Sequence, residues 1–167
     1  MIWLLAYIAT IFAANWLVVH VGIVPVGFGL VAPAGVYVVG IGFTLRDLVH
    51  RQLGRWWVLG AIIIGAALSA LVSSRFAIAS GATFLVAELA DMAVYEPLHR
   101  RNWLAAVLVS NTVGLVVDSA MFLLLAFGSL QYLAGQVVGK GWMTALAVLA
   151  IWSWRALSLR RRSVAAV

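Results

Sequence analysis

Carboxylate and amide side chains stand inside two strongly apolar stretches in the middle of the chain. The first stretch, FAIASGATFLVAELADMAVYEP, holds Glu88 and Asp91, and the second, NWLAAVLVSNTVGLVVDSAMFLLLAF, holds Asn111 and Asp118. On helices, spacings of three and seven residues place each pair on one face. Burying a carboxylate in hydrocarbon costs about 2.5 to 3.5 kcal/mol, so something must compensate for this cost. The pattern predicts that these faces line a buried polar site.

The composition of the chain is that of an integral membrane protein. Of its 167 residues 65% are hydrophobic and 10% are charged, whereas soluble domains average about 25% charged residues. The formal charge of +6 comes from bases in short loops and near the C-terminus rather than on one soluble face, so no nucleic-acid partner is expected. With no cysteines and three widely separated histidines, we expect neither a metal site nor a cofactor.

Six apolar runs are separated by short polar or glycine- and proline-containing connections. We therefore predict an all-α fold, a six-helix transmembrane bundle formed by residues 1–155 as one domain and followed by a basic cytoplasmic tail, 156–167. The first run lacks a basic residue before Trp3 and is interpreted as an uncleaved span. Pro97 is expected to end the fourth helix. The predicted helices cover about residues 2–22, 34–48, 57–72, 76–96, 103–127 and 133–154.

The basic residues are distributed unequally between the two faces that a six-span protein would have. Arg75 is the only base predicted on the face opposite the termini. By the positive-inside rule, both termini are expected in the cytoplasm. The expected location is the inner or plasma membrane, which the chain crosses several times. The bases on the termini-bearing face are Arg46, Arg51, Arg55, Arg100, Arg101, Arg155, Arg160, Arg161 and Arg162.

Counting residues from the predicted cytoplasmic helix ends gives each polar group an approximate depth. Asp118 and Lys140 both lie about 14 or 15 residues in, so they are candidate salt-bridge partners, either as an internal tie or as a coupling pair. Asn15, Glu88 and Asn111 fall in one layer about 8 to 12 residues in. For Asn15, an interhelical hydrogen bond and a place in the site are equally compatible with the sequence.

The residues closest to the predicted cytoplasmic end are Asp91 and Asp47, which follows Arg46. Glu88 has no obvious basic partner at its depth, so a proton, water or a ligand is expected to neutralise it. The candidates for substrate binding are therefore Asn15, Glu88, Asp91 and Asn111, with Asp47 as a further polar candidate.

The sequence resembles the VUT family, the vitamin-uptake-like group that includes queuosine precursor transporters. The resemblance runs in order over roughly residues 13–145 and is carried by a colinear set of segments rather than by one motif. These segments are AANWLV, GIGFTLRDLVHRQLG, ASGATFLVAELADMAVYEPLHRR, SNTVGLVVDSAMFLLLAF and VVGKGWMTAL.

The resemblance implies a six-helix importer of 7-deazaguanine bases, preQ0 or preQ1. It places the family's polar positions at Asn15, Asp47, Glu88, Asp91, Asn111, Asp118 and Lys140. Such a ligand suits these groups, since a carboxylate accepts from a guanine-like edge and an amide serves the neighbouring acceptor. Aromatic faces such as Trp16, Tyr37 or Phe84 could stack on the ring.

Other function classes fit the sequence less well. An enzyme is not expected, because no histidine lies at mid-depth and neither GxxxxGK[ST] nor HExxH occurs. A substrate-binding membrane subunit of an energy-coupling-factor type vitamin transporter is the main alternative to a solitary importer. The expected partners are thus a small-molecule substrate and the lipid bilayer, while a homo-oligomer and a separate energising module both stay open.

Overall fold

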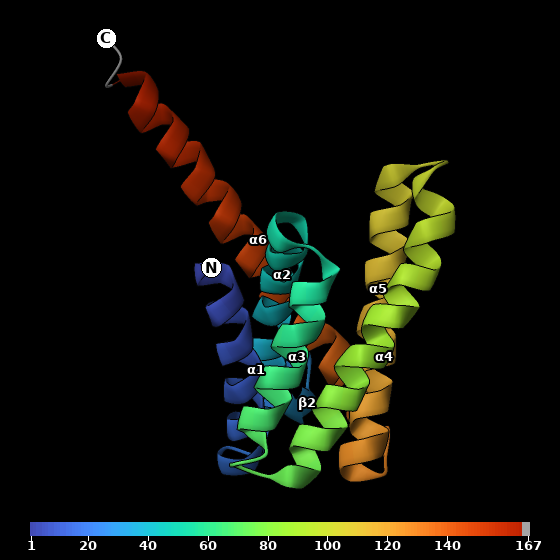
Figure 1. Ribbon diagram of the computed structural model, residues 1–167. Helices are drawn as coiled ribbons and strands as arrows, with labels where there is room; N and C mark the ends of the chain where they lie inside the picture. The colour runs from blue at the N-terminus through green and yellow to red at the C-terminus, as the bar shows by residue number, and fades with distance from the viewer. Residues whose placement is uncertain (165–167) are drawn as a thin grey trace.

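The structure, a computed structural model, consists of six helices and one β-hairpin (Figure 1). It describes residues 1–164, apart from the side chains of His99, Trp103, Leu104, Val107 and Leu108 and of residues 151, 152 and 154–164. The helices are α1 (Ile2–His20), α2 (Val36–Leu53), α3 (Arg55–Ser69), α4 (Ser74–His99), α5 (Trp103–Phe127) and α6 (Leu133–Val164). The predicted helical fold is confirmed, and four of the described helices are long and apolar enough to cross a membrane.

The four candidate spans are Ile2–His20, Ser74–Leu98, Val109–Phe127 and Leu133–Ala150. The other two helices differ from them in length or polarity. Helix α3 has 15 residues, which reach only about 22 Å. Helix α2 has 18 residues but includes Arg46, Asp47 and Arg51. The chain is therefore a multi-pass membrane protein in which α2 and α3 lie among longer apolar helices.

The connection between α1 and α2 is a β-hairpin, which the sequence reading did not predict. Strands β1 (Ile23–Gly27) and β2 (Leu30–Pro33) pair antiparallel. The turn residues Phe28 and Gly29 have φ of 53° and 73°, the conformation of the tight turns that suit the twist of paired strands. The hairpin packs closely on α6, because a Cβ built at Gly135 would lie 2.1 Å from the Val31 carbonyl oxygen.

Three of the predicted helix ends are wrong. Pro97 lies inside α4, which ends two residues later; its missing N–H removes only one hydrogen bond of the last turn. Helix α2 extends to Leu53 rather than to residue 48. Helix α6 extends to Val164, so most of the predicted tail, 156–167, is helical, and its last three residues lie outside the described residues.

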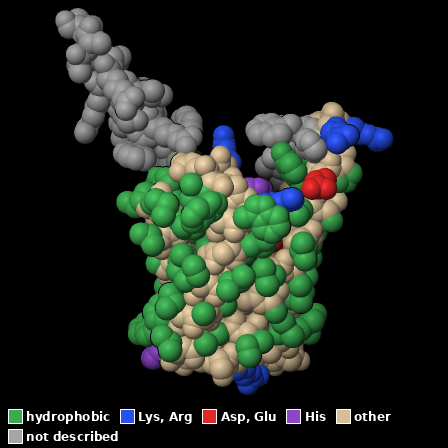
Figure 2. Space-filling model, viewed as in Figure 1, with side chains coloured by type: hydrophobic (Ala, Val, Ile, Leu, Met, Phe, Trp, Pro, Cys, Tyr) green, Lys and Arg blue, Asp and Glu red, His purple; other side chains and the backbone are tan. Residues whose placement is uncertain are grey.

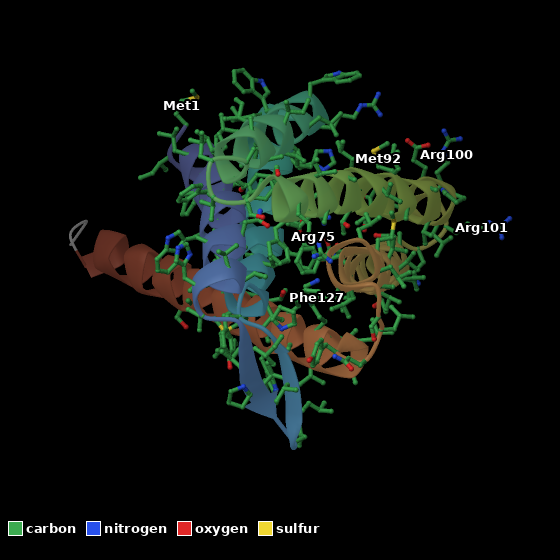
Figure 3. All side chains as sticks on the ribbon, turned by 90° about the horizontal axis from the view of Figure 1, so that it is seen from below. Met1, Arg75, Met92, Arg100, Arg101 and Phe127 are labelled. Carbon is green, nitrogen blue, oxygen red and sulfur yellow. The ribbon has the colours of Figure 1, made fainter. Side chains whose placement is uncertain are left out.

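Helices α1 to α5 run roughly up or down the molecule and α6 runs obliquely, so that their ends gather at two opposite faces (Figure 1). One face carries the N-terminus, the α2–α3 and α4–α5 turns and the far end of α6; the other carries the hairpin and the α3–α4 turn. Apolar side chains cover the waist of the visible surface, with Lys and Arg side chains at both ends (Figure 2). From below, Arg100 and Arg101 project at the edge of the molecule, far from Arg75 (Figure 3).

Candidate functional site

A small, partly enclosed cavity lies in the interior of the bundle, where α1, α2, α4, α5 and α6 meet. It offers about 20 Å³ to the centres of water molecules, which is room for about one water. Its lining is mostly apolar with a few polar groups, as expected of a small-molecule site. The residues that line it are Ala14, Asn15, Val18, Pro33, Gly35, Val36, Val39, Ser80, Phe84, Asp118, Phe122, Gln136 and Lys140.

Asn15 forms the part of the cavity wall that joins three helices. Its side chain is 2% exposed, and Nδ2 donates to Ser80 Oγ at 2.8 Å and to Ser69 Oγ at 3.1 Å. The same nitrogen lies 3.1 Å from the Ile11 carbonyl oxygen. Asn15 therefore both makes the interhelical hydrogen bonds and lines the cavity, the two roles that the sequence left open.

Asp118 and Lys140 form an ion pair across α5 and α6. The Lys140 ammonium lies 2.5 Å from Asp118 Oδ2 and 3.1 Å from Ser119 Oγ, and both members of the pair are 2% exposed. A built Cβ at Gly40 would lie 2.6 Å from the Lys140 carbonyl oxygen, so α2 packs closely against α6 at this level. The structure thus brings together the two residues whose estimated depths coincide.

Gln136 lies one helical turn before Lys140 and also faces the cavity. Its side chain is 2% exposed, and its Oε1 has no hydrogen-bond partner among the described residues. Sequence reasoning missed Gln136 because it lies close to the turn before α6. Its spacing of four residues from Lys140, which places both on one helix face, is the sequence signal that could have identified it.

Two phenylalanine rings contribute most of the aromatic surface of the cavity. Phe84 on α4 and Phe122 on α5 both line it. Of the other aromatic residues considered for stacking on a ligand, Trp16 is exposed and stacks on His20 instead. The Tyr37 hydroxyl donates to the Pro25 carbonyl oxygen in the hairpin. Phe84 is therefore the predicted stacking residue that the structure places at the cavity.

A second polar cluster surrounds Arg46, a residue that the sequence predicts at the cytoplasmic end of the second helix. Arg46 is 8% exposed, and its Nη2 donates to Asp47 Oδ1 at 2.8 Å and to Asn111 Oδ1 at 3.2 Å. Its Nη1 lies 3.2 Å from Glu88 Oε2. The expectation that Glu88 lacks a basic partner is wrong, because α2 continues past Arg46 and holds the guanidinium inside the bundle.

The Arg46 cluster lies above the cavity, toward the face that carries both termini. Arg46 is seven residues beyond the cavity residue Val39 on α2, or about 10 Å. Glu88 is four residues beyond Phe84, or about 6 Å. Asn111 is seven residues from Asp118 in the same direction. We call Arg46, Glu88 and Asn111 the upper polar layer; three of the helices that enclose the cavity contribute to it.

A family model described as "putative vitamin uptake transporter" matches residues 67–155, slightly more than half of the chain. The chain belongs to this vitamin uptake transporter family. No curated protein and no solved structure matches it.

The match to the vitamin uptake transporter family covers α4, α5 and the cavity-lining part of α6. It therefore includes the cavity residues Asp118, Gln136 and Lys140. It also includes Glu88 and Asn111 of the upper polar layer. Helices α1 and α2, which supply Asn15, Arg46 and Asp47, lie before the matched segment. Both polar clusters are thus built from the matched segment and the N-terminal helices together.

Asp91 lies one helical turn beyond Glu88 on α4, next to the upper polar layer. It is half-buried, and its Oδ1 has no hydrogen-bond partner among the described residues. Its side chain faces α5, because a Cβ built at Gly114 would lie 3.4 Å from Asp91 Cβ. No group of three or more His, Asp or Glu side chains in the described part of the chain is arranged to hold a metal ion.

Proposed function

We propose that this member of the vitamin uptake transporter family imports a 7-deazaguanine queuosine precursor, preQ0 or preQ1, across the inner or plasma membrane. The cavity is the proposed substrate site. The observation that carries this proposal is the small cavity inside an apolar helix bundle, lined by the Asp118–Lys140 pair, the amides of Asn15 and Gln136 and two phenylalanine rings.

The chemistry of the cavity lining matches that of a guanine-like ring. Such a ring carries an N1–H and an exocyclic amine as donors beside a carbonyl acceptor, and an amide side chain offers the complementary groups. Phe84 and Phe122 provide apolar surface for the flat faces of the ring. In a mostly apolar site with a few convergent polar groups, apolar contacts with the ring faces provide affinity, and hydrogen bonds to the ring edge provide specificity.

The charge of the cavity lining favours a neutral substrate. Asp118 and Lys140 carry opposite charges 2.5 Å apart and neutralise each other. A ligand with a net charge would enter a low-dielectric site without a counter-ion of its own, which is costly. Among 7-deazaguanine bases this favours preQ0, whose 7-substituent is a neutral nitrile, over preQ1, whose aminomethyl group is a cation at neutral pH.

Transport requires the cavity to open, because its present volume accommodates about one water molecule. We assign closure on the termini-bearing side to the upper polar layer, in which Arg46 on α2 joins Glu88 on α4 and Asn111 on α5. With both termini in the cytoplasm, this is the exit side of an importer. Glu88, Asn111 and the nearby Asp47 and Asp91 are then the groups that the base meets as the layer separates.

An uptake assay tests this proposal. Cells that cannot make the base but retain the later steps would express the chain and receive labelled preQ0, preQ1 or the 7-carboxylate analogue. We expect cells that express the chain to accumulate at least about tenfold more preQ0 than cells without it. The cationic preQ1 and the anionic 7-carboxylate analogue should accumulate less than preQ0.

A Leu71→Ala variant, altered at an exposed position that does not line the cavity, should transport like the parent. Absence of uptake for all three rings would refute the proposal. Uptake that requires a co-expressed ATP-driven module would instead identify the chain as a substrate-binding subunit of the energy-coupling-factor type.

A further inference from the structure

One polar atom at the cavity has unused hydrogen-bonding capacity. Gln136 Oε1 is buried and has no partner among the described residues, although Gln136 lies on an ordinary helix and is 2% exposed. Buried polar side chains in proteins are nearly always hydrogen-bonded, so an exception calls for an explanation. An unpaired buried acceptor lowers the stability of the fold unless something in the cavity donates to it.

Several other polar atoms at the cavity are already engaged with protein partners. The Asn15 amide nitrogen donates to Ser69 and Ser80. Asp118 and Lys140 are bonded to each other, and Lys140 also donates to Ser119. A ligand would have to displace these interactions in order to use those groups. Gln136 Oε1 is a buried acceptor at the cavity that a ligand can engage without such a cost.

The position of Gln136 also suits a role in reading the ligand. It lies one turn from Lys140 on the same face of α6, and the same cavity is lined by Phe84 and Phe122 from the opposing helices. A flat ring resting against the phenylalanine side chains would present its edge, not its face, to the polar groups of the lining. An acceptor at that edge discriminates between a ring that carries an N–H and one that does not.

We propose that Gln136 is the specificity-determining residue of this cavity and that its Oε1 accepts a hydrogen bond from a ring N–H of the bound molecule. The ligand class is a neutral, planar heteroaromatic ring with an unsubstituted lactam-type N–H at its edge. This inference rests on the proposed function, because it takes the cavity as the substrate site. Beyond the proposed function, it identifies Gln136 as the residue that selects the substrate and the ring N–H as the group that is recognised.

The first test compares two amide replacements without ligand. Gln136→Met keeps the length of the side chain and removes an unsatisfied acceptor, so the purified variant should melt at the parent's temperature or about 2 to 4 °C above it. The matched control is Asn15→Leu, which removes an amide bonded to Ser69 and Ser80 and should melt below the parent. If Gln136→Met melts as far below the parent as Asn15→Leu, Gln136 is a structural residue and the inference is wrong.

The second test measures binding of preQ0 and of its N1-methyl derivative to the purified protein in detergent. The parent should prefer preQ0 by at least about tenfold, because methylation removes the donor that meets Oε1 and leaves the acceptor unpaired. Gln136→Met should bind both rings about equally, whereas Gln136→Glu, which keeps an acceptor, should retain the preference.

The outcomes of the binding test separate the two proposals. If the parent binds neither ring, the proposed function fails and this inference falls with it. If the parent prefers preQ0 and Gln136→Met keeps the full preference, the inference about Gln136 alone is wrong, and the proposed function stands.

Discussion

Lys140→Met is expected to cost the protein about 3 to 5 kcal/mol of stability, because it leaves Asp118 as an uncompensated charge in the interior. Asp118→Asn should cause a loss of the same order by stranding the Lys140 ammonium. In the double variant neither charge remains, so much of the loss should be recovered. Membrane abundance and detergent melting of the four proteins in this cycle measure the effect.

Ser119→Ala supplies the control for the charge-pair cycle. It removes a neutral group that accepts from Lys140 at 3.1 Å and leaves the ion pair in place, so about 1 kcal/mol is expected. Strictly additive losses for Lys140→Met and Asp118→Asn would show that the two residues do not neutralise each other. Recovery of stability without recovery of uptake would assign the pair to transport as well as to folding.

Arg46→Met is the second substitution for which we expect a large effect. It leaves buried Glu88 without a counter-ion and removes the donor to Asp47 and Asn111, so a loss of about 3 kcal/mol is expected. Glu88→Gln should cost less than about 1 kcal/mol, because Arg46 keeps the Asp47 carboxylate and the Asn111 amide as partners. The two variants should therefore differ clearly in melting temperature.

Arg51→Met provides the matched control on the same helix. Arg51 lies five residues beyond Arg46 and is exposed, so its replacement should change stability by no more than about 0.5 kcal/mol. Equal tolerance of Arg46→Met and Arg51→Met would mean that the upper polar layer does not hold α2 to α4 and α5. The assignment of that layer as the closure of the cavity would then fail.

The sequence was sufficient to predict elements whose ends are chemically marked. Helix α5 has the predicted bounds, since Asn102 caps its first turn by accepting from the Ala105 amide at 3.1 Å and Gly128 ends it with φ of 68°. The neighbourhood of Asp118 and Lys140 also follows from depth, because α5 starts and the predicted sixth helix ends at the same face, and both helices rise at the same rate per residue.

The errors arise where a residue's tertiary partners decide its environment. The sequence predicts that Arg46 and Asp47 end the second helix. Asp47 and Glu88 offset the charge of the guanidinium, Asn111 accepts a hydrogen bond from it, and α2 continues to Leu53. The hairpin depends on a positive φ at Phe28, and a phenylalanine in the sequence gives no indication of that conformation. Gln136 lies three residues after the start of α6, close to the turn before it, where a polar residue does not stand out in the sequence.

The central claim, that the interior cavity holds the transported base, is tested most directly by thiol protection, because the chain has no cysteine of its own. Val39→Cys places one thiol at the cavity, and Leu71→Cys places one at a position that is 83% exposed and not part of the cavity lining. The rate of labelling by a small thiol reagent would be measured for each purified variant with increasing preQ0. We predict that preQ0 slows labelling at position 39 in a saturable manner and leaves position 71 unaffected. Unchanged labelling at position 39, at preQ0 concentrations that saturate uptake by the same variant, would contradict the claim.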